Sequence, residues 1–180
     1  IFSGFYSIAD KAIHIPSKII ASSISEVSYK HISDIANDNK ILSNYIEKSM
    51  AGVLQISIIP FLIILLFGRV LATIFLGDQW NAAGLYIQFL SPLVFLQFLS
   101  SPIGVFFQKN RNDIVFKLQI IYLVFSVIGL GLGYVLGSAT IAIISFSLLL
   151  CIQSILSIYL NFRLANASFK NMFYNFRNTF

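Results

Sequence analysis

Five long apolar stretches divide the chain, and each is long enough to cross a lipid bilayer. A transmembrane helix needs about 20 mostly apolar residues to cross roughly 30 Å of hydrocarbon. The stretches cover residues 4–28, 49–76, 83–107, 118–136 and 139–162. Proline inside such helices is tolerated where neighbouring groups satisfy the freed carbonyl, so Pro16, Pro92 and Pro102 predict kinks and not chain breaks. The pattern therefore predicts an all-α, polytopic transmembrane bundle of about five spans.

The polar segments between these stretches alternate in their content of basic residues. Nine Lys and Arg lie on one side, in the segment 31–48 with its edge, in the loop 108–117 and in the tail 163–180, whereas the two opposite turns contain none. They are Lys30, Lys40, Lys48, Lys109, Arg111, Lys117, Arg163, Lys170 and Arg177. Cytoplasmic loops of membrane proteins carry an excess of Lys and Arg. We therefore expect residues 163–180 to form a cytoplasmic tail.

Composition and charge agree with a membrane protein. The chain is 57% hydrophobic and 11% charged, where soluble domains are roughly 45 to 50% apolar and about 25% charged. The basic residues behind the net charge of +5 are confined to particular loops. The excess therefore indicates how the chain is oriented in the membrane. No nucleic-acid partner is expected, because no basic stripe with interleaved aromatic residues occurs.

The first stretch carries a polar stripe. At 100° per residue, its members fall within an arc of about 80° on one helix face. They are Ser7, Lys11, His14, Lys18, Ser22 and Ser25. A Lys in the middle of a membrane helix costs about 2.5 to 3.5 kcal/mol on insertion scales, so such residues face a bundle interior or an aqueous cavity. The stripe is therefore expected to line a wet cleft.

Two interpretations of this stripe remain open. Lys11, His14 and Lys18 could hold an anion such as a pyrophosphate or an acidic sugar. Alternatively, Asp10 or Glu26 could neutralise a lysine inside the bundle. For His14, an interhelical hydrogen bond and proton coupling are both compatible with the pattern.

Further polar groups and glycines occur within the other stretches. Arg69 either lines the same cavity or reaches the outer interface, and Trp80 is expected to anchor the chain at that interface. Each of the other stretches contains an amide, for which interhelical hydrogen bonding is the expected role. These amides are Gln55, Gln88, Gln97, Gln119 and Gln153. Gly129 and Gly133 have the four-residue spacing that lets membrane helices approach closely, although a hinge is also compatible.

No catalytic constellation is present in the sequence. It contains no His and Cys pair at metal-ligand spacing, no GxSxG elbow and no glycine-rich phosphate loop. Cys151 is the single cysteine and can form no intrachain disulfide. We therefore expect no enzyme activity, no catalytic residue, no cofactor and no metal, and favour transport.

Several motifs resemble those of a known family. The segments GFYSIADKAIHIP and VSYKHIS, at 4–16 and 27–33, are similar to the helix and loop that open the second half of bacterial O-antigen and exopolysaccharide flippases. LFGRVLATIFLGDQW and QFLSPLVF, at 66–80 and 88–95, resemble the continuing order of the same polysaccharide biosynthesis proteins. These flippases belong to the multidrug, oligosaccharidyl-lipid and polysaccharide exporter superfamily.

The resemblance implies a fold and a function. It implies two lobes of about six helices around a central cavity, with residues 1–180 forming part of the C-terminal lobe and supplying the last five of twelve spans. The implied activity is the flipping of an undecaprenyl-pyrophosphate-linked oligosaccharide across the bacterial inner membrane for surface polysaccharide biosynthesis. The substrate-binding residues would be Lys11, His14, Lys18 and Arg69. Implied partners are the lipid-linked oligosaccharide, membrane lipids, a polysaccharide polymerase and chain-length regulator proteins.

Three alternatives remain open beside this function. A cation-coupled multidrug exporter of the same superfamily would share the fold but needs an acidic cavity, against which Lys11, Lys18 and Arg69 argue. A membrane-embedded polysaccharide polymerase typically needs a large outer loop, and both outer turns here are short. A purely structural subunit would have no use for the charged stripe.

Overall fold

The computed structural model describes residues 2–35, 38–104 and 111–178, and these ranges contain helices and turns but no strand. The helices are α1 (Phe2–Ile35), α2 (Asn39–Leu76), the 3-10 helix η1 (Asp78–Trp80), α3 (Asn81–Leu99), α5 (Asn112–Val135), α6 (Ala139–Leu164) and α7 (Phe169–Asn178). Residues 101–104 are also helical. The expected all-α bundle is confirmed.

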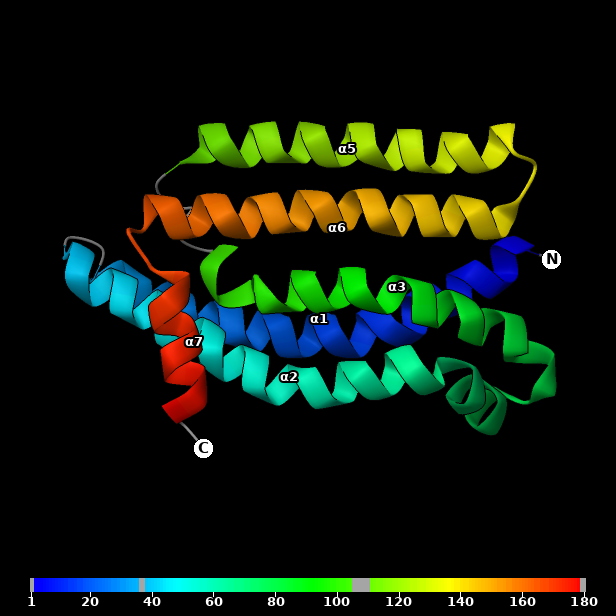
Figure 1. The fold of residues 1–180 in the computed structure, drawn as a ribbon, viewed down its shortest axis with the longest axis horizontal. Coiled ribbons are helices and arrows are strands. Elements are labelled where there is room, and N and C mark those ends of the chain that lie inside the picture. The colour runs from blue at the N-terminus through cyan, green and yellow to red at the C-terminus, as the bar shows by residue number, and fades with distance from the viewer. Residues whose placement is uncertain (1, 36–37, 105–110, 179–180) are drawn as a thin grey trace.

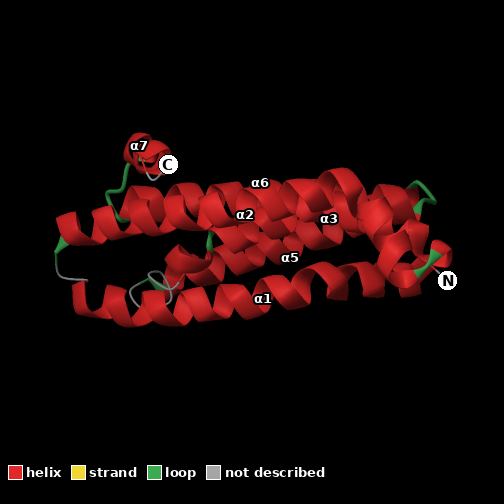
Figure 2. Cartoon of the chain, turned by 90° about the horizontal axis from the view of Figure 1, so that it is seen from below, coloured by secondary structure: helices red, strands yellow, loops and turns green. Residues whose placement is uncertain are grey.

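The long helices run side by side, and α7 lies across them at one end (Figure 1). α3 is the centre of the packing and contacts α1, α2 and α6, whereas α5 makes its main contacts with α6. Seen from below, α7 sits at the end of the bundle where α6 ends and α2 begins (Figure 2). This arrangement leaves α5 and much of α2 with apolar surface on the outside.

Within the described residues, four segments are long and apolar enough to cross a membrane. They are α2, the Asp78–Leu99 segment, α5 and α6. α1 is not among them, although its 34 residues extend over about 51 Å at 1.5 Å per residue. Its polar stripe lowers its hydropathy, so the first span, 4–28, stays a prediction.

The polar segment 31–48 is mostly helical and not an open loop. α1 continues to Ile35, and α2 begins at Asn39 after Asp38, whose carboxylate accepts from the backbone N–H groups of Lys40 (2.9 Å) and Ile41 (3.1 Å). This is N-capping, which satisfies donors at the start of a helix. The two helices project beyond the end of α6 as a hairpin (Figure 1).

The expected span 83–107 is interrupted in the structure. α3 ends at Leu99, and a turn at Ser100 separates it from the helical residues 101–104. Pro102 has no N–H, and its ring would clash with the carbonyl four residues earlier, so the helix breaks here and does not only kink. At Pro16 and Pro92 the helices continue, as expected. The predicted end of this span, at 107, lies outside the described residues.

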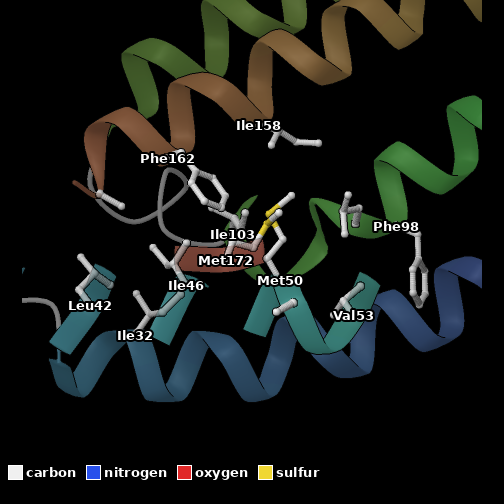
Figure 3. Close-up of a cluster of buried hydrophobic side chains, with 13 residues drawn as sticks. Ile32, Leu42, Ile46, Met50, Val53, Phe98, Ile103, Ile158, Phe162 and Met172 are labelled. Atoms are coloured by element: carbon white, nitrogen blue, oxygen red, sulfur yellow. The ribbon is translucent and has the colours of Figure 1, made fainter. Parts of the chain in front are cut away.

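Two apolar clusters hold the bundle together at different heights. The larger contains Ile32, Ile46, Met50, Ile158 and Phe162 and joins α1, α2, α3, α6 and α7 near the end where α7 lies (Figure 3). The smaller joins α1, α3 and α6 near the opposite end. Its buried members are Ala9, Ala83, Tyr86, Leu90 and Ile143, with Trp80 packed against them. In a membrane, lipid tails are as apolar as these side chains, so the clusters stabilise the bundle mainly by van der Waals packing.

Glycines set the distance between α5 and α6. A Cβ on Gly129 would lie 2.6 Å from the Phe146 Cα, and one on Gly133 would overlap Ala142. The Ser145 hydroxyl donates to the Gly129 carbonyl at 2.6 Å across the same contact. The close-packing interpretation of this glycine pair is therefore confirmed.

Polar contacts fasten α7 to α2 at both ends. The carboxylate Oε1 of Glu47, which is 5% exposed, accepts from the Ser168 backbone N–H at 2.7 Å and from the Asn171 amide at 3.4 Å. A carboxylate at a helix N-terminus is stabilised by the unpaired N–H groups and the helix dipole. At the other end, the Gln55 amide donates to the Phe176 carbonyl at 2.8 Å. The expected interhelical role of Gln55 is confirmed.

Replacing Glu47 with Ala is expected to release α7. Hydrogen bonds to a charged group contribute about 1.5 to 3 kcal/mol each, so the loss should raise local opening of α7 by roughly tenfold or more. Tryptic cleavage after Lys170 in detergent measures this opening. Glu26→Ala, which removes an exposed carboxylate from α1, is the matched control. Equal cleavage of the two variants would show that Glu47 does not hold α7.

Candidate functional site

A polar cavity of about 520 Å³ lies among α1, α3, α5 and α6. Its lining is Tyr6, Asp10, His14, Lys18, Leu93, Gln97, Ser100, Gln119, Tyr122, Phe146, Gln153, Ser154 and Ser157. All but two of these side chains carry a hydrogen-bonding group. Such a concentration of polar groups is expensive inside a membrane bundle and marks a functional site.

The cavity lies between the two apolar clusters along the helices. On α3, Gln97 comes between Leu90 of the smaller cluster and Leu99 of the larger one. On α6, Gln153 lies between Ile143 and Ile158 of the same two clusters. The apolar layers above and below therefore fix the helices that carry the polar groups.

The structure brings together only half of the predicted binding residues. His14 and Lys18 line the cavity, whereas Lys11 and Arg69 do not and are exposed on α1 and α2. α1 is rotated so that Asp10, about 80° around the helix from Lys18, faces inward, while Lys11 lies about 20° on the other side of Lys18. The whole stripe was expected to line the wet cleft, but the cavity includes only His14 and Lys18 of it and extends to Tyr6 and Asp10 beside it. Binding by all four residues stays a prediction.

The cavity brings together the Asp10 carboxylate, the His14 imidazole and the Lys18 ammonium. The His14 Nε2 lies 3.3 Å from the Asp10 Oδ1, within one turn of α1. In the described part of the chain, no carboxylate lies within ion-pair distance of the Lys18 ammonium. The alternative interpretation, in which Asp10 or Glu26 neutralises a lysine inside the bundle, is therefore not seen for Lys18 among the described residues, and Asp10 contacts His14 on its own helix instead.

Three glutamines from three helices face the cavity. Gln97, Gln119 and Gln153 come from α3, α5 and α6, and their side-chain amides make no hydrogen bond to other described residues. Gln88 differs, because its amide donates to the carbonyls of Leu65 and Leu66 at 3.0 Å and joins α3 to α2. The expected interhelical hydrogen bond is therefore confirmed for Gln88. The amides of Gln97, Gln119 and Gln153 line the polar cavity instead. The sequence showed that these glutamines lie within apolar stretches, but it did not show that all three face one cavity.

The arrangement can bind a polar, anionic molecule. Amides and hydroxyls both donate and accept, which matches the many hydroxyls of a sugar, and a Lys ammonium donates to phosphate oxygens. Asp10 and His14 add an acceptor and a second titratable group. The cavity therefore suits recognition of a ligand with hydroxyls and one anionic end.

Residues 3–85 match the family model described as polysaccharide biosynthesis protein. No curated protein and no solved structure matches the chain. The family segment covers α1, α2, η1 and the start of α3, and thus includes the α1 wall of the cavity with His14 and Lys18. The four segments long and apolar enough to cross a membrane fit a multi-pass membrane protein, and the match of residues 3–85 supports a role in polysaccharide biosynthesis.

Water access to the polar cavity can be measured by cysteine labelling. In a Cys151→Ala background, Gln97→Cys and Gln153→Cys should react with a membrane-impermeant thiol reagent, because a polar cavity holds water. Leu148→Cys is the control, since Leu148 is 61% exposed on the apolar outside of α6 and should stay unlabelled in the bilayer. Labelling of Leu148→Cys alone, or of no position, would contradict a wet cavity.

Proposed function

We propose that this protein takes part in flipping an undecaprenyl-pyrophosphate-linked oligosaccharide across the bacterial inner membrane. The observation that carries the proposal is the polar cavity, which is lined by Lys18 and by three glutamine amides that have no partner among the described residues. The match of residues 3–85 to the family described as polysaccharide biosynthesis protein supports it.

The residues that line the cavity bind different parts of the substrate in this proposal. The amides of Gln97, Gln119 and Gln153 exchange hydrogen bonds with sugar hydroxyls, replacing those that water supplies. Lys18 pairs with the anionic pyrophosphate, and the lipid tail stays in the surrounding hydrocarbon. The basic ends of the helices, including the C-terminus, lie in the cytoplasm in this proposal.

One observation favours a second candidate, a cation-coupled exporter of the same superfamily. Asp10 faces the cavity, and Lys11 and Arg69, two of the three cations that argued against an acidic site, lie outside it. The neighbouring His14 would give such an exporter a titratable partner. Lys18 still opposes a cationic substrate, so we place this function second.

Proteoliposomes containing the full-length protein test the proposal. A lipid-linked oligosaccharide is placed in the inner leaflet, and its arrival outside is followed with a sugar-binding lectin. We expect arrival to depend on the protein, with unchanged glycan length. Export of a cationic dye without movement of the oligosaccharide would establish the second candidate, and lengthening of the glycan would establish a polymerase.

A further inference from the structure

A second cavity, of about 800 Å³, lies on another side of the bundle and is almost wholly apolar. Its walls come from α2, α3 and α6, with Leu54, Phe61, Phe95 and Ile155 among the lining side chains. The Ser91 hydroxyl is satisfied internally, because it donates to the Gln88 carbonyl at 3.0 Å. We name this cavity the apolar groove.

α7 closes the groove at one end. Phe169, Met172, Phe173 and Phe176 of α7 contribute to its lining. The helix lies across the bundle helices (Figure 1) and is held there by the Glu47 and Gln55 contacts with α2. An amphipathic helix in this orientation is typical of the membrane interface, with its apolar side in the acyl region.

One edge of α7, next to its groove-facing side, is basic. Lys170 and Arg177 are exposed, and Arg163 is exposed at the end of α6. The Arg177 guanidinium lies 6.0 Å from the centroid of the Tyr174 ring, which keeps it near the helix surface. Residues 163–180 contain no Asp or Glu. An apolar groove between membrane helices therefore ends at a basic rim, and among the described residues neither Lys170 nor Arg177 forms an ion pair.

We propose that the apolar groove and α7 form a binding site for an anionic phospholipid. An acyl chain occupies the groove, and the phosphate headgroup contacts Lys170 and Arg177 at the interface. The charge complementarity selects this occupant, because a basic segment near the membrane surface gains about 1 kcal/mol per Lys or Arg with anionic lipid. If a protein segment occupied the groove, the basic residues at its end would have no explanation. The proposal is independent of the transport function.

The test uses the full-length protein in nanodiscs with phosphatidylglycerol that carries a photoactivatable group in its acyl chain. Mass spectrometry should locate crosslinks on the groove walls of α2 and α3 and on α7. Lys170→Gln with Arg177→Gln should reduce these crosslinks roughly tenfold. Arg111→Gln with Lys117→Gln, which removes the same charge at the exposed start of α5, should leave them unchanged.

A second pair of variants tests whether the acyl chain lies in the apolar groove. Leu54→Trp fills the groove and should abolish the crosslinks, whereas Ile56→Trp, at a side chain 73% exposed on the outside of α2, should not. Equal crosslinking by a phosphatidylcholine probe with the same chain would overturn headgroup selection. Displacement of the probe by undecaprenyl phosphate at equal concentration would assign the groove to the carrier lipid instead. Absence of groove crosslinks would show that protein covers it, and would also overturn the proposal.

Discussion

Lys18→Ala in the full-length protein is expected to reduce surface polysaccharide at least tenfold, while Lys11→Ala leaves it near the normal amount. Lys18 lines the polar cavity without a carboxylate partner among the described residues, whereas Lys11, seven residues earlier on α1, is exposed outside it. A charge-assisted hydrogen bond contributes about 1.5 to 3 kcal/mol, which corresponds to roughly 10- to 100-fold in binding. Surface glycan in a deletion strain complemented with each variant provides the measurement.

The two lysine variants are matched, because each removes one ammonium from the same helix. Membrane fractionation should show equal amounts of both proteins, which separates binding from insertion. Lys18→Arg, which keeps the charge, should retain part of the activity. Normal glycan with Lys18→Ala, or equal loss with Lys11→Ala, would remove the cavity from the proposed function.

Gly133→Leu is expected to prevent α5 from packing on α6 and to remove most of the folded protein. A Cβ at Gly133 already overlaps Ala142, and the neighbours at this contact include helix backbone, which cannot move aside like a flexible side chain. Overpacking of an interior costs typically about 1 to 3 kcal/mol, and more where backbones must separate. Because α5 makes its main contacts with α6, the substitution should disrupt the whole interface between these two helices. The monodisperse fraction in size-exclusion chromatography measures the effect.

Gly131→Leu provides the control for this loss. It makes the same substitution on the same helix, but a Cβ at Gly131 meets no atom within 4 Å. Gly131→Leu should therefore keep the monodisperse fraction of the parent protein. If Gly131→Leu and Gly133→Leu behaved alike, the loss would reflect helix propensity or insertion and not the contact with α6.

Several polar side chains show why the sequence could predict a cavity but not its lining. A charged residue at mid-helix must avoid lipid, so Lys18 and His14 alone indicate an interior wet site. Which neighbours share that site depends on the rotation of α1 against α3 and α6. A small rotation of α1 about its axis turns Asp10 into the cavity and Lys11 out of it. A periodic pattern that covers an arc of about 80° does not fix this rotation. The same limit applies to Gln97 and Gln88, which look alike in sequence yet face a cavity and a backbone carbonyl.

The sequence by itself determined the helical bundle with its membrane-length segments, most helix positions, the close approach at Gly129 and Gly133, and the match of residues 3–85 to a polysaccharide biosynthesis family. These features depend on local hydropathy, on spacing along one helix and on motifs, all of which a single segment carries. Only the tertiary structure decided which side chains form the polar cavity, that Glu47 and Gln55 fasten α7, and that α7 closes an apolar groove. Residues Glu47 and Ser168 lie 121 positions apart. Contacts at such separation follow from the packing of whole helices, and packing depends on the shapes of all the surfaces that meet.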